Sequence, residues 1–187
     1  MKENNIFFIS WRAKLSTPYI HDLGRIKGMF NFSKILPKTV TNELNSPKIA
    51  IWGFVLFTAL MTWRSIIHML FESYGFHGIA NFVVLIGDPD PMPVIYRFFS
   101  LWGNAQLMFC LVCWVVIFRY KSLIPLMSLF WVLDWGQRLF LYPFIREDIT
   151  SIGQYTKDIT PGVDLALLPF VITVVIFLIS VANKRAR

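Results

Sequence analysis

The chain has 187 residues, of which 56% are hydrophobic and only 16% are charged, and its mean hydropathy is +0.56. Globular domains are closer to about 45–50% apolar and about 25% charged, so this composition excludes an ordinary soluble domain. The net charge of +7 does not indicate nucleic-acid binding, because no motif of interleaved basic and aromatic residues accompanies it.

A basic arm comes first. Residues 1–48 contain eight basic and three acidic side chains, for a net charge of +5. Within the arm, Ile20, Leu23, Ile26 and Phe30 recur at helical spacing, which is typical of a short amphipathic helix on an anionic lipid surface. A solvated cytoplasmic tail is the alternative interpretation. We expect no cleavable leader, because the first long apolar segment starts only after these mostly polar residues.

Four apolar segments follow, near residues 49–71, 98–118, 123–144 and 163–182. Each is long enough to cross the roughly 30 Å hydrocarbon core of a bilayer as a helix of about 20 residues. The segments are continuously apolar rather than alternating, so we reject a β-barrel and predict an all-α fold. This fold is a four-helix transmembrane bundle over residues 49–182, in which short links make sequential helices antiparallel neighbours.

Prolines and small polar residues predict where these helices begin. Ser46 and Thr160 each precede a proline at the start of an apolar segment. We expect their side chains to accept hydrogen bonds from the first N–H groups of the helices. The proline-rich run over 88–93 cannot sustain a helix, and we expect it to be a rigid extended loop.

Charge predicts the orientation, because basic residues are retained on the cytoplasmic side of a membrane. The arm, the link at 119–122 and the tail at 183–187 carry net charges of +5, +2 and +3. The two remaining loops, 72–97 and 145–164, each carry −2. The alternation holds at every loop, so we expect both termini to be cytoplasmic.

Polar side chains inside the predicted spans form the main candidate site, because ionisable groups are costly at bilayer depth and commonly mark function. With the predicted orientation they all lie between the midplane and the outer surface. Asn104 points away from Gln106, and we prefer Gln106 because the small Gly103 on its stripe allows close helix approach. The candidate ligand-binding residues are Arg64, His68, Gln106, Asp134, Gln137 and Arg138.

Two interpretations of this cluster remain open. In the structural one, Asp134 and Arg138, four residues apart, form an ion pair that only fixes helix packing, and Arg64 extends to the outer headgroups. In the functional one, Arg64 and Arg138 attract an anion and Asp134 positions Arg138. His68 and Gln106 would then supply hydrogen bonds to a ligand or take part in proton transfer.

Weaker signals are also present. Cys110 and Cys113 have a redox-like spacing, but in an apolar helix they are more typical of packing residues. His68 is the only histidine inside a span, so bis-histidine haem ligation is not supported. Trp131 and Trp135 flank the acidic residue of the third span and could line a pocket for a flat apolar ligand.

The run Arg119-Tyr120-Lys121-Ser122-Leu123-Ile124-Pro125-Leu126-Met127, followed by Asp134 and Arg138, resembles a pattern in a family of small bacterial integral membrane proteins. Pro161-Gly162 followed by Leu167-Leu168-Pro169 is similar to their last span. The resemblance covers roughly the C-terminal half. It implies a bacterial four-helix membrane bundle, DoxX-like in architecture only, and it implies no activity.

The leading hypothesis is therefore a non-catalytic, multi-pass protein of the bacterial inner membrane that binds a lipid, a small ligand or a partner protein through the polar cluster. The first alternative is a membrane enzyme or redox accessory acting on quinone or lipid. The second is a small proton-coupled transporter, although no polar route leads to the cytoplasmic side. The expected partners are membrane lipids and a membrane protein or second copy of the chain, with no nucleic acid. The sequence specifies no cofactor and no metal site.

Overall fold

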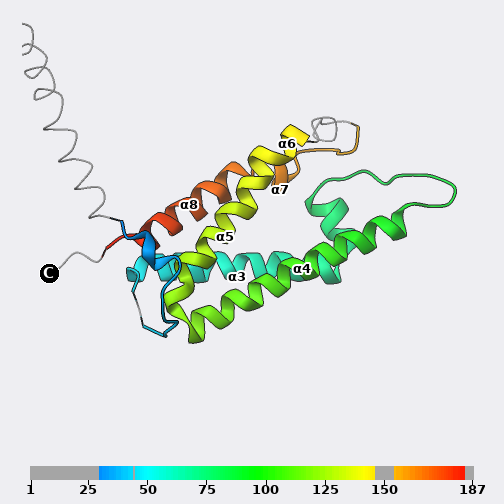
Figure 1. Ribbon diagram of the computed structural model, residues 1–187. Helices are drawn as coiled ribbons and strands as arrows, with labels where there is room; N and C mark the ends of the chain where they lie inside the picture. Colours follow the sequence, from blue (N-terminus) through cyan, green and yellow to red (C-terminus); the bar gives the residue numbers. More distant parts are fainter. Residues whose placement is uncertain (1–29, 44, 146–153, 184–187) are drawn as a thin grey trace, which may run out of the picture.

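The computed structural model describes residues 30–43, 45–145 and 154–183, and the regular structure in these ranges is entirely helical (Figure 1). The all-α prediction is therefore confirmed for this part of the chain. The amphipathic helix predicted in the basic arm and most of the tail lie outside the described residues. The elements are η1 (Phe32–Lys34), α3 (Lys48–Leu70), η2 (Tyr74–Ile79), α4 (Met92–Arg119), η3 (Lys121–Leu123), α5 (Ile124–Gly136), η4 (Gln137–Leu141), α6 (Tyr142–Ile145), α7 (Pro161–Asp164) and α8 (Leu167–Val181).

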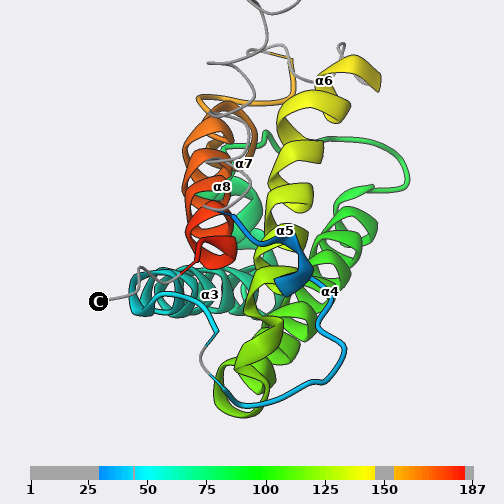
Figure 2. The same cartoon turned by 60° about the vertical axis from the view of Figure 1, so that its left-hand side comes forward.

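The long helices form two hairpins. α3 packs along α4, and α5 packs along α8, whereas α4 and α5 make far fewer contacts with each other. Figures 1 and 2 show these two hairpins diverging from the η3 link that joins them. The prediction that all sequential helices lie side by side is thus wrong for α4 and α5, because the hairpins separate as they leave the link.

Close approach of α3 and α4 depends on Gly103. A Cβ atom added there would lie 2.7 Å from the Met69 backbone nitrogen and 2.8 Å from the His68 carbonyl carbon. No larger side chain fits in that space without moving a helix. The expected close contact at Gly103 is confirmed.

The core lies where the two hairpins meet. Phe54, Met61 and Trp131 are each 1% exposed, and Cys110 and Cys113 are fully buried beside them. The Phe57 and Trp131 rings are nearly perpendicular at a centroid distance of 5.3 Å, a favourable aromatic geometry. Both cysteines are unpaired thiols within this apolar cluster, the environment expected of packing residues.

The first three predicted segments match the observed helices, except that α4 starts earlier than predicted and the third segment is divided into α5, η4 and α6. α3 agrees to within one residue at each end, whereas α4 starts at Met92, six residues before the predicted start. The predicted extended loop over 88–93 is therefore wrong at its end, because Pro93 occupies the first turn of α4, where its missing N–H is not needed. The third segment continues from α5 through η4 and α6.

The fourth segment is interrupted. α7 ends at Asp164, and α8 resumes only at Leu167. Neither predicted side-chain cap is formed: the Ser46 hydroxyl donates to the Ser180 carbonyl at 2.8 Å, and the Thr160 hydroxyl donates to the Ala80 carbonyl at 2.9 Å. Taken singly, only α3 and α4 among the described helices are long and apolar enough to cross a membrane.

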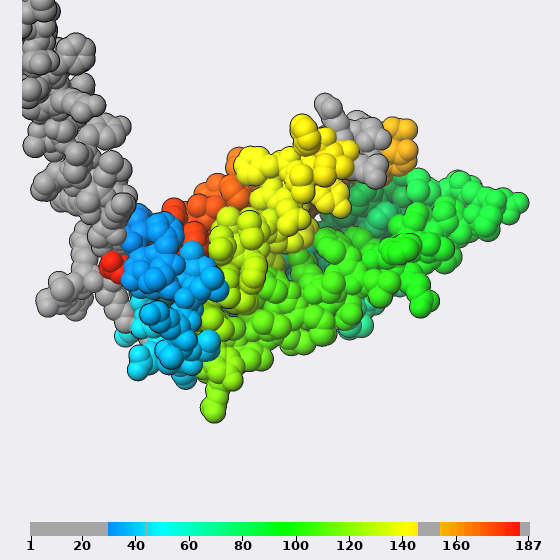
Figure 3. All heavy atoms as spheres, viewed as in Figure 1, coloured from blue at the N-terminus to red at the C-terminus, as the bar shows by residue number. Residues whose placement is uncertain are grey.

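The segment from Phe30 to Ser46 ties together one end of the two hairpins. The Asn31 N–H donates to the Val181 carbonyl at 2.8 Å, and the Thr41 N–H donates to the Ser122 hydroxyl at 2.9 Å. Figure 3 shows this blue and cyan part of the chain against the ends of α5 and α8. The hairpins are thus held together at this end, and the opposite end contains the candidate site.

Candidate functional site

A cavity of about 490 Å³ lies between the hairpins at the end where they diverge. We call it the polar cavity. α3, η2, α4, the α5–α6 segment and α7 all contribute to its wall, so chain segments distant in sequence meet there. Its lining residues are Arg64, His68, Phe76, Ile79, Ala80, Phe82, Phe99, Trp102, Asp134, Gln137, Arg138, Tyr142, Thr160, Pro161, Gly162 and Val163.

Arg64 is held in place by neutral groups. Its Nη1 donates to Oε1 of Gln106 at 2.7 Å, and the Ser65 hydroxyl donates to the same oxygen at 3.3 Å. On the other side, a Cβ atom added to Gly162 would lie 3.1 Å from Nη2 of Arg64. No carboxylate of the described residues lies within 4 Å of this guanidinium.

Arg138, in contrast, has a carboxylate partner one helical turn away. Its Nη2 lies 3.1 Å from both carboxylate oxygens of Asp134, and its Nε donates to Oδ2 at 3.3 Å. The Arg138 side chain is 14% exposed and that of Asp134 is 36% exposed. The predicted pair therefore exists and faces the polar cavity.

Two tryptophan rings hold the arginines close to each other. The guanidinium carbons of Arg64 and Arg138 lie 4.9 and 5.2 Å from the centroid of Trp102. They lie 6.0 and 4.9 Å from that of Trp135. The electron-rich faces of the rings attract both cations, which offsets part of their mutual repulsion.

The described lining therefore has an excess of positive charge. With His68 taken as neutral, the charged side chains are the two arginines and Asp134, which leaves a net charge of +1. An anion entering the polar cavity would meet two guanidiniums and, among the described lining residues, a single carboxylate, which is paired with Arg138.

His68 contributes a hydrogen-bond acceptor. Its Nδ1 lies 2.7 Å from the Arg64 carbonyl oxygen, which can only accept, so Nδ1 carries the proton. In the neutral ring Nε2 is then unprotonated, and no described residue hydrogen bonds to it. The ring stacks on Phe99 at 4.7 Å and meets Trp102 edge-on at 5.1 Å. The imidazole thus joins the charged and aromatic parts of the cavity.

An aromatic wall extends away from the arginines. The centroid of Trp102 lies 5.6 Å from that of Phe99, and Phe99 lies 5.4 Å from Phe76. Phe76 then stacks on Phe82 at 4.5 Å. We call these four residues the aromatic wall. It brings an apolar surface from α4, η2 and the following loop into the same cavity.

The loops that supply part of this wall are fastened to each other. The Val83 N–H donates to the Tyr155 carbonyl at 2.9 Å, and the Lys157 N–H donates to the Asn81 carbonyl at 2.8 Å. The Asn81 side-chain amide also donates to the Ile159 carbonyl at 2.6 Å. These bonds fix Phe82 and Thr160 at the rim of the polar cavity.

Irregular helix geometry coincides with the cavity. The π-helical η4 contains Gln137 and Arg138, and π-helical turns are often found at functional sites. Gly162 lies in α7, and this short helix directly precedes the break at residues 165 and 166. Both departures from a regular α-helix therefore adjoin the polar cavity.

The structure brings the predicted site residues together. Five of the six candidates line the polar cavity, and Gln106 lies behind Arg64 as its hydrogen-bond partner. Gln106 is 7% exposed whereas Asn104 is exposed, which confirms that Gln106 rather than Asn104 faces the protein interior. Neither of the two tryptophans proposed to line a pocket is among the lining residues of the polar cavity. Both belong to the core cluster, although the ring of Trp135 also contacts both arginines.

Several residues that line the cavity are not among the candidates predicted from the sequence. Trp102 lies one helical turn before Gln106, so helical periodicity could have identified it. Phe76, Phe82 and Gly162 had no comparable signal, because they come from loops and a short helix whose positions depend on tertiary packing.

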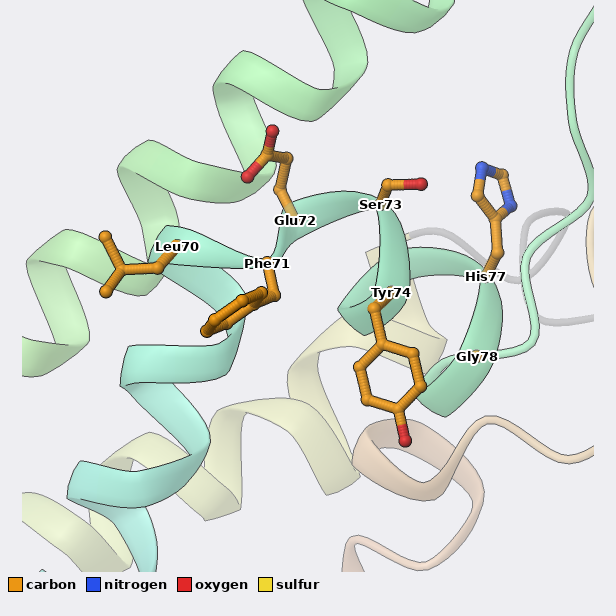
Figure 4. Close-up of a pocket in the computed structure, with 7 residues that line it drawn as sticks. All are labelled: Leu70, Phe71, Glu72, Ser73, Tyr74, His77 and Gly78. Atoms are coloured by element: carbon orange, nitrogen blue, oxygen red, sulfur yellow. The ribbon is translucent and has the colours of Figure 1, made fainter.

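A second, shallower pocket follows the end of α3, and Figure 4 shows seven residues that line it. Its polar side chains do not converge: in Figure 4 the Glu72 carboxylate and the His77 ring lie well apart, and Tyr74 extends to the opposite side. Both nitrogens of His77 are hydrogen bonded, to the Phe82 carbonyl and to the Tyr96 hydroxyl. The polar cavity is therefore the better candidate site.

Comparisons with known proteins add no assignment: no family model, no curated protein and no solved structure matches the chain. The resemblance to small bacterial membrane proteins remains a prediction.

Proposed function

We propose that this chain is a multi-pass protein of the bacterial inner membrane that binds a small anionic ligand in the polar cavity without catalysing a reaction. The surface of the helices supports the membrane environment. On α3, Trp52, Leu56, Leu60 and Trp63 are 56–68% exposed, although they belong to a helix whose other face is in the core. Helices that are apolar all round are typical of membrane spans.

The proposed topology has four spans with both termini in the cytoplasm. α3 and α4, with 23 and 28 residues, are each long enough to cross alone. The continuous series from Ile124 to Ile145 and the interrupted segment from Pro161 to Val181 would provide the other two. A break in a spanning segment is tolerated where the backbone lines a cavity, which is the setting of α7.

The guanidinium of Arg64, which has no carboxylate within 4 Å among the described residues, is the observation that carries the ligand proposal. Gln106 positions it, Gly162 leaves room beside it, and Asp134 is already bound to Arg138. A cation at membrane depth without a counter-ion is unfavourable, and an anionic ligand would supply that counter-ion. Under this proposal Arg64 and Arg138 bind the anion, and the side-chain amide of Gln137 donates a hydrogen bond to it, whereas the unprotonated Nε2 of His68 can only accept from a donor group elsewhere on the ligand.

Co-purification tests the ligand. We expect gentle detergent extraction followed by mass spectrometry to find a stoichiometric small anion with the wild-type chain. Arg64→Gln should lose it. The matched control Arg97→Gln should keep the anion, because Arg97 is an exposed side chain of α4 that does not line the cavity. Equal recovery from all three proteins, or recovery of no anion from any, would contradict the proposal.

Cysteine labelling tests the topology separately. Ser33 and Ser73 are both exposed; Ser33 belongs to η1, next to the C-terminal end of α8, and Ser73 follows the C-terminal end of α3. In a chain lacking Cys110 and Cys113, we expect a membrane-impermeant maleimide to label Ser73→Cys in intact bacteria. Ser33→Cys should react only after the membrane is opened. The reverse pattern, or equal labelling of both, would refute the orientation.

A further inference from the structure

We propose that the polar cavity selects an organic monoanion with an apolar body, whose single charged head binds at the arginines and whose body lies on the aromatic wall. This inference rests on the proposed function, because it assumes that an anion binds there. It adds the chemical class of the ligand.

The charge of the ligand follows from the described lining. The guanidinium of Arg138 is paired with Asp134, and that of Arg64 has the neutral side chain of Gln106 as its hydrogen-bond partner. A ligand with one negative charge brings the net charge of the lining to zero. A multiply charged anion would leave excess negative charge in a poorly solvated site, which is unfavourable.

The apolar body follows from the order of the rings. Arg64 and Arg138 contact one end of the aromatic wall at Trp102. The wall then continues through Phe99 and Phe76 to Phe82, each ring in contact with the next. Ile79 and Val163 add aliphatic surface to the lining. The polarity of the cavity thus changes from cationic to apolar along its length, and a complementary ligand is amphiphilic.

The size of the cavity agrees with such a ligand. A volume of about 490 Å³ falls within the range of about 300–1,000 Å³ typical of sites for organic molecules. A water molecule occupies about 30 Å³ in the liquid, so an inorganic anion or acetate would leave most of the cavity unfilled. Such small anions can satisfy Arg64, but they cannot cover the aromatic wall.

Titration calorimetry in phosphatidylcholine nanodiscs tests the ligand class with three sodium salts (acetate, decanoate and 2-naphthoate) and one alcohol (decanol). Empty nanodiscs correct for partitioning into lipid. Decanoate or 2-naphthoate should bind at least about 100-fold tighter than acetate, because burial of about four methylene groups contributes that factor. Decanol, which lacks the charge, should bind at least about tenfold more weakly than decanoate. Preference for decanoate assigns a membrane fatty acid as the source, and preference for 2-naphthoate assigns a soluble aryl carboxylate.

Matched variants separate the two ends of the site. Phe99→Ala should lower the affinity for the preferred apolar anion by about tenfold and leave the affinity for acetate unchanged. Phe98→Ala, its 69% exposed neighbour on α4, should change neither. Arg64→Gln should lower the affinity for every anion, whereas Arg64→Lys should retain part of that affinity. Thermal unfolding of each variant identifies any that fail to fold.

The outcomes distinguish this inference from the proposed function. If acetate binds as tightly as the apolar anions through Arg64, the ligand class is wrong and the anion site remains. If decanol equals decanoate, the cavity is an apolar site and the charge assignment is wrong. If no anion binds to the wild-type protein, both proposals fail.

Discussion

Replacement of Gly103 by alanine tests the helix contact that positions the polar cavity. The added Cβ would meet three atoms of α3 at 2.7–2.8 Å: the Met69 nitrogen and the carbonyl carbon and Cβ of His68. Ordinary contact starts near 3.4 Å, so α3 would have to move by more than about half an ångström. The two backbone atoms and the Cβ cannot rotate away as the end of a long side chain can.

The expected loss of stability can be obtained from two opposing effects. Overpacking of this kind costs about 1–3 kcal/mol, and the higher helix propensity of alanine recovers at most about 1 kcal/mol. Because three atoms are met below 3.0 Å and two of them are backbone, the overpacking cost should lie in the upper part of that range, at about 2–3 kcal/mol, and we expect the free energy of unfolding to fall by about 1–2 kcal/mol. For a chain of this size, that corresponds to a Tm lower by about 2–8 °C. Anion binding should weaken as well, because the displaced backbone belongs to the residue that carries the cavity imidazole.

Thermal unfolding of the purified protein in nanodiscs measures this effect, and Gly53→Ala is the control. That substitution likewise lies inside a long helix, here α3, but its Cβ would meet only the side chain of Ile176, at 3.2 Å. It should leave the Tm unchanged or raise it slightly. A Gly103→Ala protein as stable as wild type would show that the close approach of α3 and α4 is not required.

Two further substitutions test individual hydrogen bonds. Gln106→Leu removes the partner of Arg64 and should lower the free energy of unfolding by about 1.5–3 kcal/mol, because a charged donor loses its acceptor. Asn104→Leu, the same change on the exposed face of α4, should have little effect, and equal losses would contradict the assigned role. Trp114→Phe removes an indole N–H that donates to a threonine hydroxyl of α3 at 3.0 Å, and chemical denaturation should show a loss of about 1 kcal/mol. Trp63→Phe, at a 59% exposed position, is its control, and a larger loss there would refute the assignment.

Local periodicity was sufficient to predict much of the candidate site. Residues four apart on a helix share a face in any fold, so the positions of Arg64 beside His68 and of Asp134 beside Arg138 follow from spacing alone. The same geometry distinguished Gln106 from its neighbour Asn104. The long apolar segments likewise predicted helices, because a backbone surrounded by apolar side chains must satisfy its own hydrogen bonds.

Only the tertiary structure decided how these faces meet. The distance between α3 and α4 depends on the space at Gly103, and that distance brings Arg64 within reach of Gln106. The divergence of α4 and α5 opens the polar cavity, while hydrogen bonds between two loops place Phe82 at its rim. These features depend on side-chain volumes and on contacts between segments far apart in the chain. For that reason the sequence by itself determined which residues are polar on each helix face, but not that two arginines share a cavity with an aromatic wall.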